Sequence, residues 1–322
     1  MVSAPAGSGS SGPPLLVGRS DDPWPRATSL LAAVIGDPIR HSLSPSLLNA
    51  AFRVAGLDWV YVAFEVRSGD AGAAVMAART LGIAGMSVTM PHKTAIVGAL
   101  DGCSATAAKL GAVNTVVRRG SALLGESTDG EGFINALRES AAMDPAGRDC
   151  IVLGTGGAAR AVVLALAEHG ARSVGVVGRR AEAVAAAASL AGTAGRAATS
   201  GEASSADLVV NATPVGMSGT SVARTGAPVG SDTGPGSARS GPGSGDLLVA
   251  SEDLGPGQVV MDLVYEPRTT PLLETARMRG ALAVGGVGML VHQAALAFKL
   301  WTGEEAPLAA MWDAVAGDRE AG

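Results

Sequence analysis

The chain has 322 residues, enough for two domains that each bury a hydrophobic core. It carries 24 Lys and Arg residues against 29 Asp and Glu residues, a formal net charge of -5, and the basic residues form no cluster that could follow a phosphate backbone. Hydrophobic residues make up 47% of the chain, which excludes a wholly disordered protein. We therefore expect a globular protein that does not bind nucleic acid.

The N-terminal segment has no basic stretch followed by an apolar one, as a signal peptide would, so we expect a cytoplasmic protein. The two cysteines, Cys103 and Cys150, lie far apart and match no disulfide framework or metal-ligand spacing, so we expect no metal site. The longest uncharged run covers residues 281–298 but contains Gly, His and Gln. We interpret it as a buried strand, turn and helix, and predict no membrane partner.

Residues 1–28 are rich in Gly, Ser and Pro without an apolar period, and we expect a tail there. In the part that follows, short apolar segments alternate with helical patterns, as in α/β folds. The first helix is predicted over 45–55, with Ser44 as its N-cap and Pro45 at its first position; a second covers 70–80. Strands are predicted over 32–35, 60–66, 85–90, 114–117 and 123–126.

The second half starts a new alternation of strands and helices. We predict strands over 151–153, 173–177, 208–211 and 259–264, and helices over 158–169 and 271–279, with an alanine-rich helix after the second of these strands. Residues 218–245 consist mainly of Gly, Ser, Pro and Thr and are predicted to be a flexible insertion. Two final helices, over 289–301 and 307–316, have no strand after them, and we expect them to pack on the first half.

A glycine-rich turn follows the strand at 151–153. Its residues precede a helix, a context in which backbone N–H groups and the helix N-terminus bind a pyrophosphate. A tight turn without a ligand is the alternative, but the strand on each side favours dinucleotide binding. The loop residues are Gly154, Thr155, Gly156, Gly157 and Ala158.

Two arginines follow the next strand, at the point that faces the adenosine ribose in dinucleotide-binding folds. An acidic residue there would bind the 2′-hydroxyl of NAD, whereas Arg179 and Arg180 offer donors to a 2′-phosphate. The pattern favours NADP. Two solvated arginines are the alternative, and the nearby Glu182 leaves NAD open.

Two charged residues are candidates for acid–base chemistry. Lys93 follows a predicted strand, in a chain with only three lysines, and a lysine can transfer a proton where an arginine cannot. Asp129 begins a predicted helix, where a capping role alone would explain it. A carboxylate that reaches Lys93 would orient its ammonium group, which makes the pair a candidate catalytic site.

Eight segments, taken in order, resemble the shikimate dehydrogenase family, which includes quinate/shikimate dehydrogenases. They are GDPIRHSLSPSLLN, SVTMPHK, GAVNT, STDGEGF, LGTGGAAR, NATPVGM, DLVYEPRTTPLL and GVGMLVHQAALAFKLWTG. The likeness runs from residue 35 to about residue 303, without the insertion. It implies reversible, NADP-linked reduction of 3-dehydroshikimate to shikimate, a step toward chorismate and the aromatic amino acids.

The resemblance also implies roles for individual residues. Lys93 would be the acid–base residue, and Asp129 would pair with it and bind a ring hydroxyl. The residues implied for the substrate carboxylate are Ser42 and Ser44, with Tyr265 nearby, and those implied for ring hydroxyls are Thr89, Asn114 and Gln293. The residues that match the cofactor segments are Gly154 to Ala158, Gly178, Arg179, Arg180, Thr213, Leu263 and Gly286.

The chain departs from the family pattern near both ligands. Ser87 and Ser127 stand where the family usually has Asn, which shortens two hydrogen-bonding side chains near the substrate. Gly178 replaces the usual Asn before the arginine, and Ala183 replaces a second arginine, whose role Arg180 is expected to take. Ala181, where NAD-preferring relatives often have Asp, favours NADP.

The expected fold is α/β with two domains around a cleft. Residues 29–128 and 286–322 would form the substrate domain, and residues 129–285 a Rossmann-like NADP domain. A quinate/shikimate or aminoshikimate dehydrogenase of another pathway is the alternative enzyme, and a ligand sensor without turnover is the alternative from another class. We expect a small-molecule substrate and a monomer or homodimer.

Overall fold

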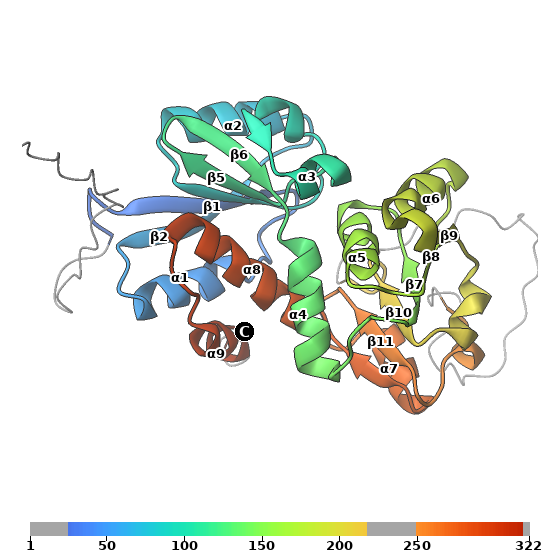
Figure 1. The fold of residues 1–322 in the computed structure, drawn as a ribbon. Helices are drawn as coiled ribbons and strands as arrows, with labels where there is room; N and C mark the ends of the chain where they lie inside the picture. Colours follow the sequence, from blue (N-terminus) through green and yellow to red (C-terminus); the bar gives the residue numbers. More distant parts are fainter. Residues whose placement is uncertain (1–24, 218–248, 318–322) are drawn as a thin grey trace, which may run out of the picture.

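The computed structural model describes residues 25–217 and 249–317. They form two α/β units, each built on a sheet of six strands, and helix α4 (Asp129–Ala141) lies between the units (Figure 1). The predicted insertion at 218–245 and most of the predicted tail lie outside the described residues. No helix in the described ranges is long and apolar enough to cross a bilayer.

The first sheet has the strand order β2-β1-β3-β5-β6-β4. Its first three strands are parallel, whereas β5 runs antiparallel to both of its neighbours. The predicted strand over 85–90 ends earlier, at Val88, because the chain then turns and the His92 N–H donates to the Thr89 carbonyl. The strands are β1 (Leu30–Gly36), β2 (Trp59–Glu65), β3 (Gly85–Val88), β4 (Gly102–Cys103), β5 (Thr115–Arg119) and β6 (Ala122–Glu126).

The helices of the first unit are α1 (Ser44–Val54), α2 (Ala71–Thr80) and the short α3 (Ala105–Leu110). The prediction that Ser44 caps α1 was wrong. Leu43 already has a helical backbone and is the N-cap, without a side-chain cap. The Ser44 N–H instead donates to Ser42 Oγ at 3.3 Å. Helix α1 therefore begins without a side-chain cap, and Ser42 accepts from the first N–H group of the helix.

The second sheet is wholly parallel, with the order β12-β11-β10-β7-β8-β9. In a parallel sheet all carboxyl ends meet at one edge, where open α/β sheets bind their ligands. The strands are β7 (Asp149–Leu153), β8 (Ser173–Val177), β9 (Gly195–Ala197), β10 (Leu208–Asn211), β11 (Val259–Asp262) and β12 (Leu282–Val284), and the helices are α5 (Gly157–Glu168), α6 (Ala181–Ala188) and α7 (Pro271–Met278).

The last two helices, α8 (Val287–Thr302) and α9 (Leu308–Gly317), return to the first unit, as predicted. Phe298 of α8 stacks on Phe52 of α1 with ring centroids 5.2 Å apart, and Met311 of α9 is buried in the same core. Helix α8 also packs along α4, where Gly132 faces the backbone of Gln293. The two helices therefore join the units. The predicted domain limits at 128/129 and 285/286 stay predictions.

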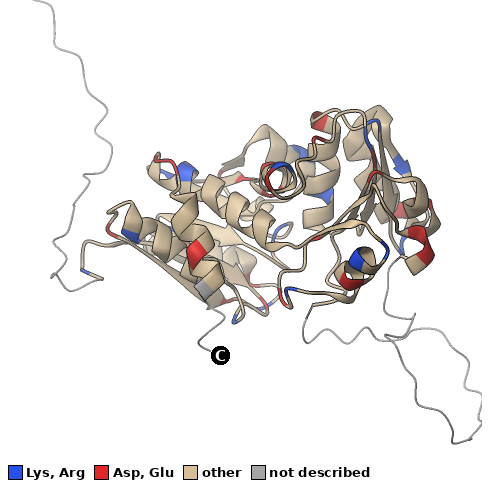
Figure 2. Ribbon diagram, turned by 90° about the horizontal axis from the view of Figure 1, so that it is seen from below, with Lys and Arg blue, Asp and Glu red and all other residues tan. Residues whose placement is uncertain are grey.

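Acidic and basic residues are interspersed over both units (Figure 2). Within the described residues, no group of three or more His, Cys, Asp and Glu side chains is arranged to hold a metal ion.

Candidate active site

The structure joins Lys93 and Asp129, which are 36 residues apart in the sequence. Lys93 Nζ donates to Asp129 Oδ2 at 2.5 Å, and the two side chains are only 17% and 8% exposed. Lys93 lies in the turn after β3, where its carbonyl accepts from the Val113 N–H at 2.8 Å. Asp129 is the first residue of α4, but Thr128 is the N-cap and no side chain caps this helix. The carboxylate therefore orients the lysine instead of capping the helix.

Asn114 fixes the other side of the same carboxylate. Its Nδ2 donates to Asp129 Oδ1 at 2.7 Å and to Thr128 Oγ1 at 2.9 Å, and its Oδ1 accepts from the Thr128 N–H at 2.8 Å. Asn114 is buried. Each oxygen of Asp129 thus has its own donor, so the carboxylate cannot rotate without breaking a charge-assisted hydrogen bond.

The glycine loop lies next to this pair. Gly154 has φ +119°, and a Cβ there would stand 3.0 Å from the Ala212 carbonyl oxygen, so both conformation and space require glycine. A Cβ on Gly156, the N-cap of α5, would meet nothing within 4 Å, so the loop is open above this residue. A Cβ on Gly157 would stand 3.3 Å from Lys93 Cδ. The helix N-terminus that could hold a pyrophosphate is thus adjacent to the lysine stem.

Arg179 and Arg180 follow β8 at the same edge of the sheet. Both are exposed, and neither side chain makes a hydrogen bond or an ion pair within the described ranges. A Cβ on Gly178 would stand 2.8 Å from Thr155 Cγ2, so the turn before the arginines touches the glycine loop. Two free guanidinium groups beside the glycine loop have the chemistry to bind a 2′-phosphate.

The ends of β10 and β11 are tied together by buried polar groups. Asn211 Nδ2 donates to Asp262 Oδ1 at 2.9 Å, and Thr270 Oγ1 donates to Asp262 Oδ2 at 2.6 Å. Burial raises the pKa of Asp262 above its usual range, although these hydrogen bonds oppose the shift. Thr213 Oγ1 in turn donates to Asn211 Oδ1 at 2.7 Å. Sequence reasoning assigned no role to Asn211 or Asp262, although both lie in the segments that carry the resemblance.

The last two cofactor candidates meet at the carboxyl ends of β11 and β12. A Cβ on Gly286 would stand 2.3 Å from the Leu263 carbonyl oxygen, so only glycine permits this approach. Leu263 itself is half-buried. Leu263 and Gly286 therefore lie at the same edge of the second sheet as the glycine loop.

The substrate candidates have more dispersed contacts. Gln293 Nε2 donates to the Leu290 carbonyl at 2.9 Å. Thr89 Cγ2 stands 2.5 Å from where a Cβ on Gly36 would lie. Burial raises the pKa of Tyr265. In the described part of the chain, no hydrogen bond joins Ser42, Ser44, Thr89, Tyr265 or Gln293 to the Lys93–Asp129 pair.

Ser87, one of the departures from the family pattern, has a defined partner. The Tyr61 hydroxyl donates to Ser87 Oγ at 2.7 Å. Tyr61 is fully buried, and burial raises its pKa well above the usual range, so the phenol remains a donor. Ser87 Oγ therefore accepts a hydrogen bond from a residue in the core of the first unit.

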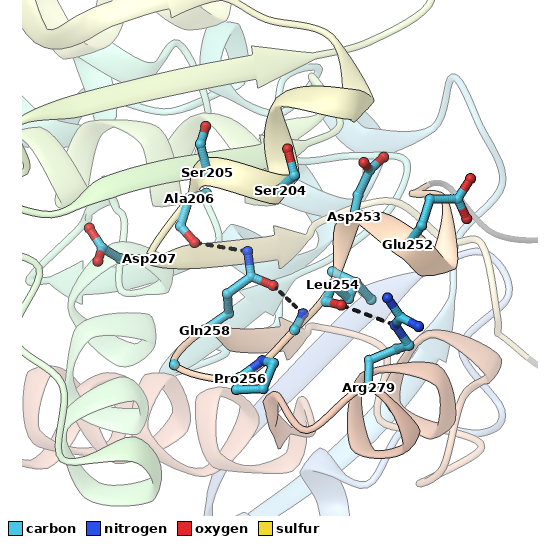
Figure 3. Close-up of a pocket in the computed structure, with 12 residues that line it drawn as sticks. Ser204, Ser205, Ala206, Asp207, Glu252, Asp253, Leu254, Pro256, Gln258 and Arg279 are labelled. Atoms are coloured by element: carbon cyan, nitrogen blue, oxygen red, sulfur yellow. Dashed lines mark hydrogen bonds between the residues drawn. The ribbon is translucent and has the colours of Figure 1, made fainter.

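A groove of about 470 Å³ lies elsewhere, near the amino ends of β10 and β11 (Figure 3). The Gln258 amide there is used by the backbone: Nε2 donates to the Ala203 and Ala206 carbonyls, and Oε1 accepts from the Gly255 N–H. Arg279 Nε donates to the Leu254 carbonyl at 3.2 Å. These polar groups hold the loops together, and the groove lies at the edge opposite the glycine loop.

This chain is similar to known proteins over most of its length. Residues 34–116 match the model of the shikimate dehydrogenase substrate binding domain, and residues 286–316 match that of the shikimate 5′-dehydrogenase C-terminal domain. Shikimate dehydrogenase (NADP(+)) of Moorella thermoacetica is 43% identical over 296 residues, which cover 89% of this chain and 92% of the relative.

Solved structures are similar over nearly the whole chain. Shikimate 5-dehydrogenase from Thermus thermophilus, in complex with NADP(H) and shikimate, has a TM-score of 0.77 at 32% identity, covering 89% of this chain and 99% of that one. Quinate dehydrogenase from Corynebacterium glutamicum, in complex with NAD, has a TM-score of 0.74 at 31% identity, covering 90% and 99%. With sequence relatives above 40% identity, these matches show that the chain belongs to the shikimate dehydrogenase family.

Proposed function

We propose that this protein is an NADP-dependent shikimate dehydrogenase, which reversibly reduces 3-dehydroshikimate to shikimate. The observation that carries the proposal is the Lys93–Asp129 pair, 2.5 Å apart and packed against Gly157 of the glycine loop. An ammonium group held beside a dinucleotide-binding loop provides a proton donor where a hydride acceptor would lie. The names of the relatives support the same activity.

In this proposal Lys93 gives a proton to the carbonyl oxygen of the substrate, and the bound NADPH supplies the hydride. In the reverse direction Lys93 accepts the proton of the hydroxyl group. Asp129 keeps the ammonium in place and accepts a hydrogen bond from a ring hydroxyl, while Asn114 holds Asp129. The remaining substrate contacts are proposed for Ser42 and Ser44 to the carboxylate, with Tyr265 nearby, and for Thr89, Asn114 and Gln293 to ring hydroxyls.

The cofactor fits the residues that are present. The first N–H groups of α5 have no acceptor within the helix, and the open space over Gly156 leaves room for a pyrophosphate. Arg179 and Arg180 would hold the 2′-phosphate, and Thr213, Leu263 and Gly286 would line the edge toward the nicotinamide. We propose residues 29–128 with 286–322 as the substrate domain, residues 129–285 as the NADP domain, and a cytoplasmic monomer or homodimer.

The test follows the reduced nicotinamide by its absorbance while the purified protein meets shikimate or quinate with NADP or NAD, in all four combinations. We expect strong turnover with shikimate and NADP. Comparable turnover with quinate or NAD would support the alternative dehydrogenase, and the absence of turnover in all four would favour a sensor over an enzyme.

A pair of variants tests the role of the lysine. Lys93→Met should abolish turnover while shikimate still binds, because the proton donor is lost and the other substrate contacts remain. Lys109→Met is the matched control, since Lys109 is an exposed lysine paired with Glu168 at 3.4 Å. Turnover of Lys93→Met close to that of Lys109→Met would remove Lys93 from the mechanism.

A further inference from the structure

We propose that Arg160 is a further cofactor-binding residue, one that holds the pyrophosphate of the dinucleotide. This inference rests on the proposed function and adds a residue to its cofactor site. Arg160 lies in the first turns of α5, three residues after Gly157. Neither the sequence pattern nor the resemblance assigned it a role.

The Arg160 side chain is half-buried, and its buried part lacks a hydrogen-bond partner. Its Nε is buried and has no hydrogen-bond partner, and the guanidinium group makes no ion pair within residues 25–217 and 249–317. Buried polar groups in native proteins are nearly always hydrogen-bonded, so an unpaired cation of this kind indicates a partner that binds from outside.

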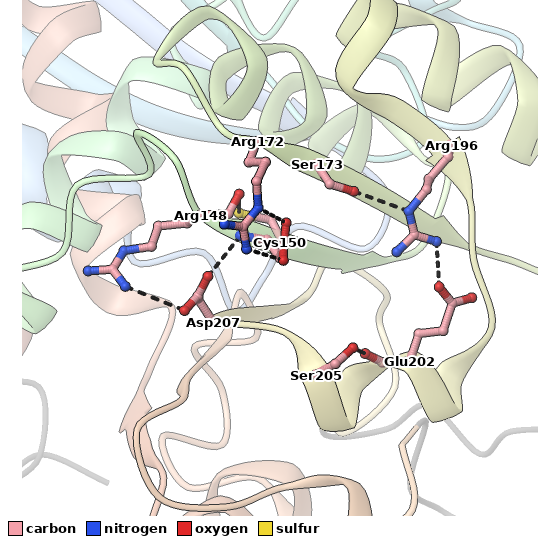
Figure 4. A network of polar contacts seen from close by, with 9 residues as sticks. Arg148, Cys150, Arg172, Ser173, Arg196, Glu202, Ser205 and Asp207 are labelled. Carbon is pink, nitrogen blue, oxygen red and sulfur yellow. Dashed lines mark hydrogen bonds and ion pairs between the residues drawn. The ribbon is translucent and has the colours of Figure 1, made fainter.

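Three other arginines of the same unit are paired with carboxylates. Arg148, Arg172 and Arg196 lie near the amino ends of the parallel strands and pair with Asp207, Asp149 and Glu202 (Figure 4). Within the described residues, Arg160, Arg179 and Arg180 near the glycine loop have no such carboxylate. Three arginines at the amino edge are thus paired with carboxylates, whereas the three near the glycine loop remain available for an anion.

The position of Arg160 favours the pyrophosphate over the 2′-phosphate and the substrate carboxylate. Side chains of a helix tilt toward its N-terminus, so the Arg160 stem projects back toward the glycine loop. Its Nη2 reaches the other unit, 3.7 Å from where a Cβ on Gly111 would lie. Arg179 and Arg180, at the end of β8, are proposed for the 2′-phosphate, and Ser42 and Ser44 are proposed for the substrate carboxylate.

The chemistry fits a diphosphate. A guanidinium group presents parallel N–H donors to two oxygens of one phosphate, or to oxygens of two adjacent phosphates. The free N–H groups of α5 would bind the same anion from the helix side. Together they would surround the pyrophosphate from two directions.

The experiment measures binding of two fragments of the cofactor by titration calorimetry. ADP-ribose contains the pyrophosphate without the 2′-phosphate, and 2′-AMP contains the 2′-phosphate without the pyrophosphate. For Arg160→Met we expect the Kd of ADP-ribose to rise by about 10-fold or more, with little change for 2′-AMP. Arg160→Lys, which keeps the charge but loses the fork, should recover part of the loss.

Two further proteins make the result specific. The double variant Arg179→Ala, Arg180→Ala should show the opposite pattern, weak 2′-AMP binding with little change for ADP-ribose. An unchanged Kd of ADP-ribose in Arg160→Met would overturn the inference, and so would equal weakening of both fragments with a lowered melting temperature, which indicates a structural role. Failure of the wild-type protein to bind NADP would instead refute the proposed function.

Discussion

The contact between α4 and α8 provides a quantitative test of how the two units are joined. A Cβ added to Gly132 would stand 2.7 Å from the backbone nitrogen of Gln293 and 2.8 Å from its Cα. Ordinary contact begins at 3.4 Å, so the Gly132→Ala methyl group would arrive about 0.7 Å too close. Two of the three nearest atoms are backbone and the third is the Gln293 Cβ, so none of them can rotate away. The helices must therefore separate.

The cost follows from two opposing effects. Overpacking of this kind costs about 1–3 kcal/mol, whereas exchanging Gly for Ala in a helix contributes up to about 1 kcal/mol of stability. We expect Gly132→Ala to lower the free energy of unfolding by about 1–2 kcal/mol. Because Gln293 is displaced, we also expect a higher KM for shikimate with little change in the KM for NADP.

The assay combines urea unfolding with steady-state kinetics of the wild type, Gly132→Ala and Gly72→Ala. Gly72 is the matched control, since it lies in the first turn of α2 and an added Cβ meets nothing within 4 Å. Gly72→Ala should be as stable as the wild type or slightly more so. If Gly132→Ala matches Gly72→Ala in both stability and KM, the close packing of α4 on α8 is not what positions Gln293.

Two predictions concern pH. Burial raises the pKa of the Cys150 thiol from 9.0 to about 12, so the unfolded chain loses this proton first and the stability falls as the pH rises above 9. Measured by urea unfolding, the stability advantage of the wild type over Cys150→Ala should shrink by about 2 kcal/mol between about pH 8 and about pH 10.5; a constant difference would contradict a buried, protonated thiol. Burial also raises the pKa of Asp262 from its ordinary value of 3.8. Asp262 therefore contributes less to the free energy of unfolding as the pH rises from 3.8 through the pKa of the folded state. Asp262→Asn should therefore gain stability relative to the wild type over that rise, and a relative loss would show that ionised Asp262 stabilises the fold.

Local patterns were sufficient for most of the architecture. Strands β8 and β10 have the predicted limits, and the glycine loop lies where the sequence places it, between β7 and α5. Apolar periodicity and glycine at a turn act over a few residues, so a sequence reveals them directly. Strand β4 and helix α3 were missed because two and six residues are too few to show a period.

Other features depend on residues that only the fold brings together. Lys93, Asn114 and Asp129 come from three separate segments, and their hydrogen bonds exist because the end of β3 and the starts of β5 and α4 lie at one place. The family resemblance indicated the residues but not these contacts. Ser44 is not the cap of α1 because the preceding turn is already helical.

Arg160 is the clearest example of a feature that the sequence alone does not reveal. The sequence around an arginine does not show whether its guanidinium group is paired, because the partner can lie far away along the chain, as Asp207 does for Arg148. Within the described residues, Arg148 is paired with the carboxylate of Asp207, whereas no carboxylate pairs with Arg160. The sequence by itself determined the elements and the chemical groups, and the tertiary structure decided which charges are neutralised within the protein and which remain for a ligand.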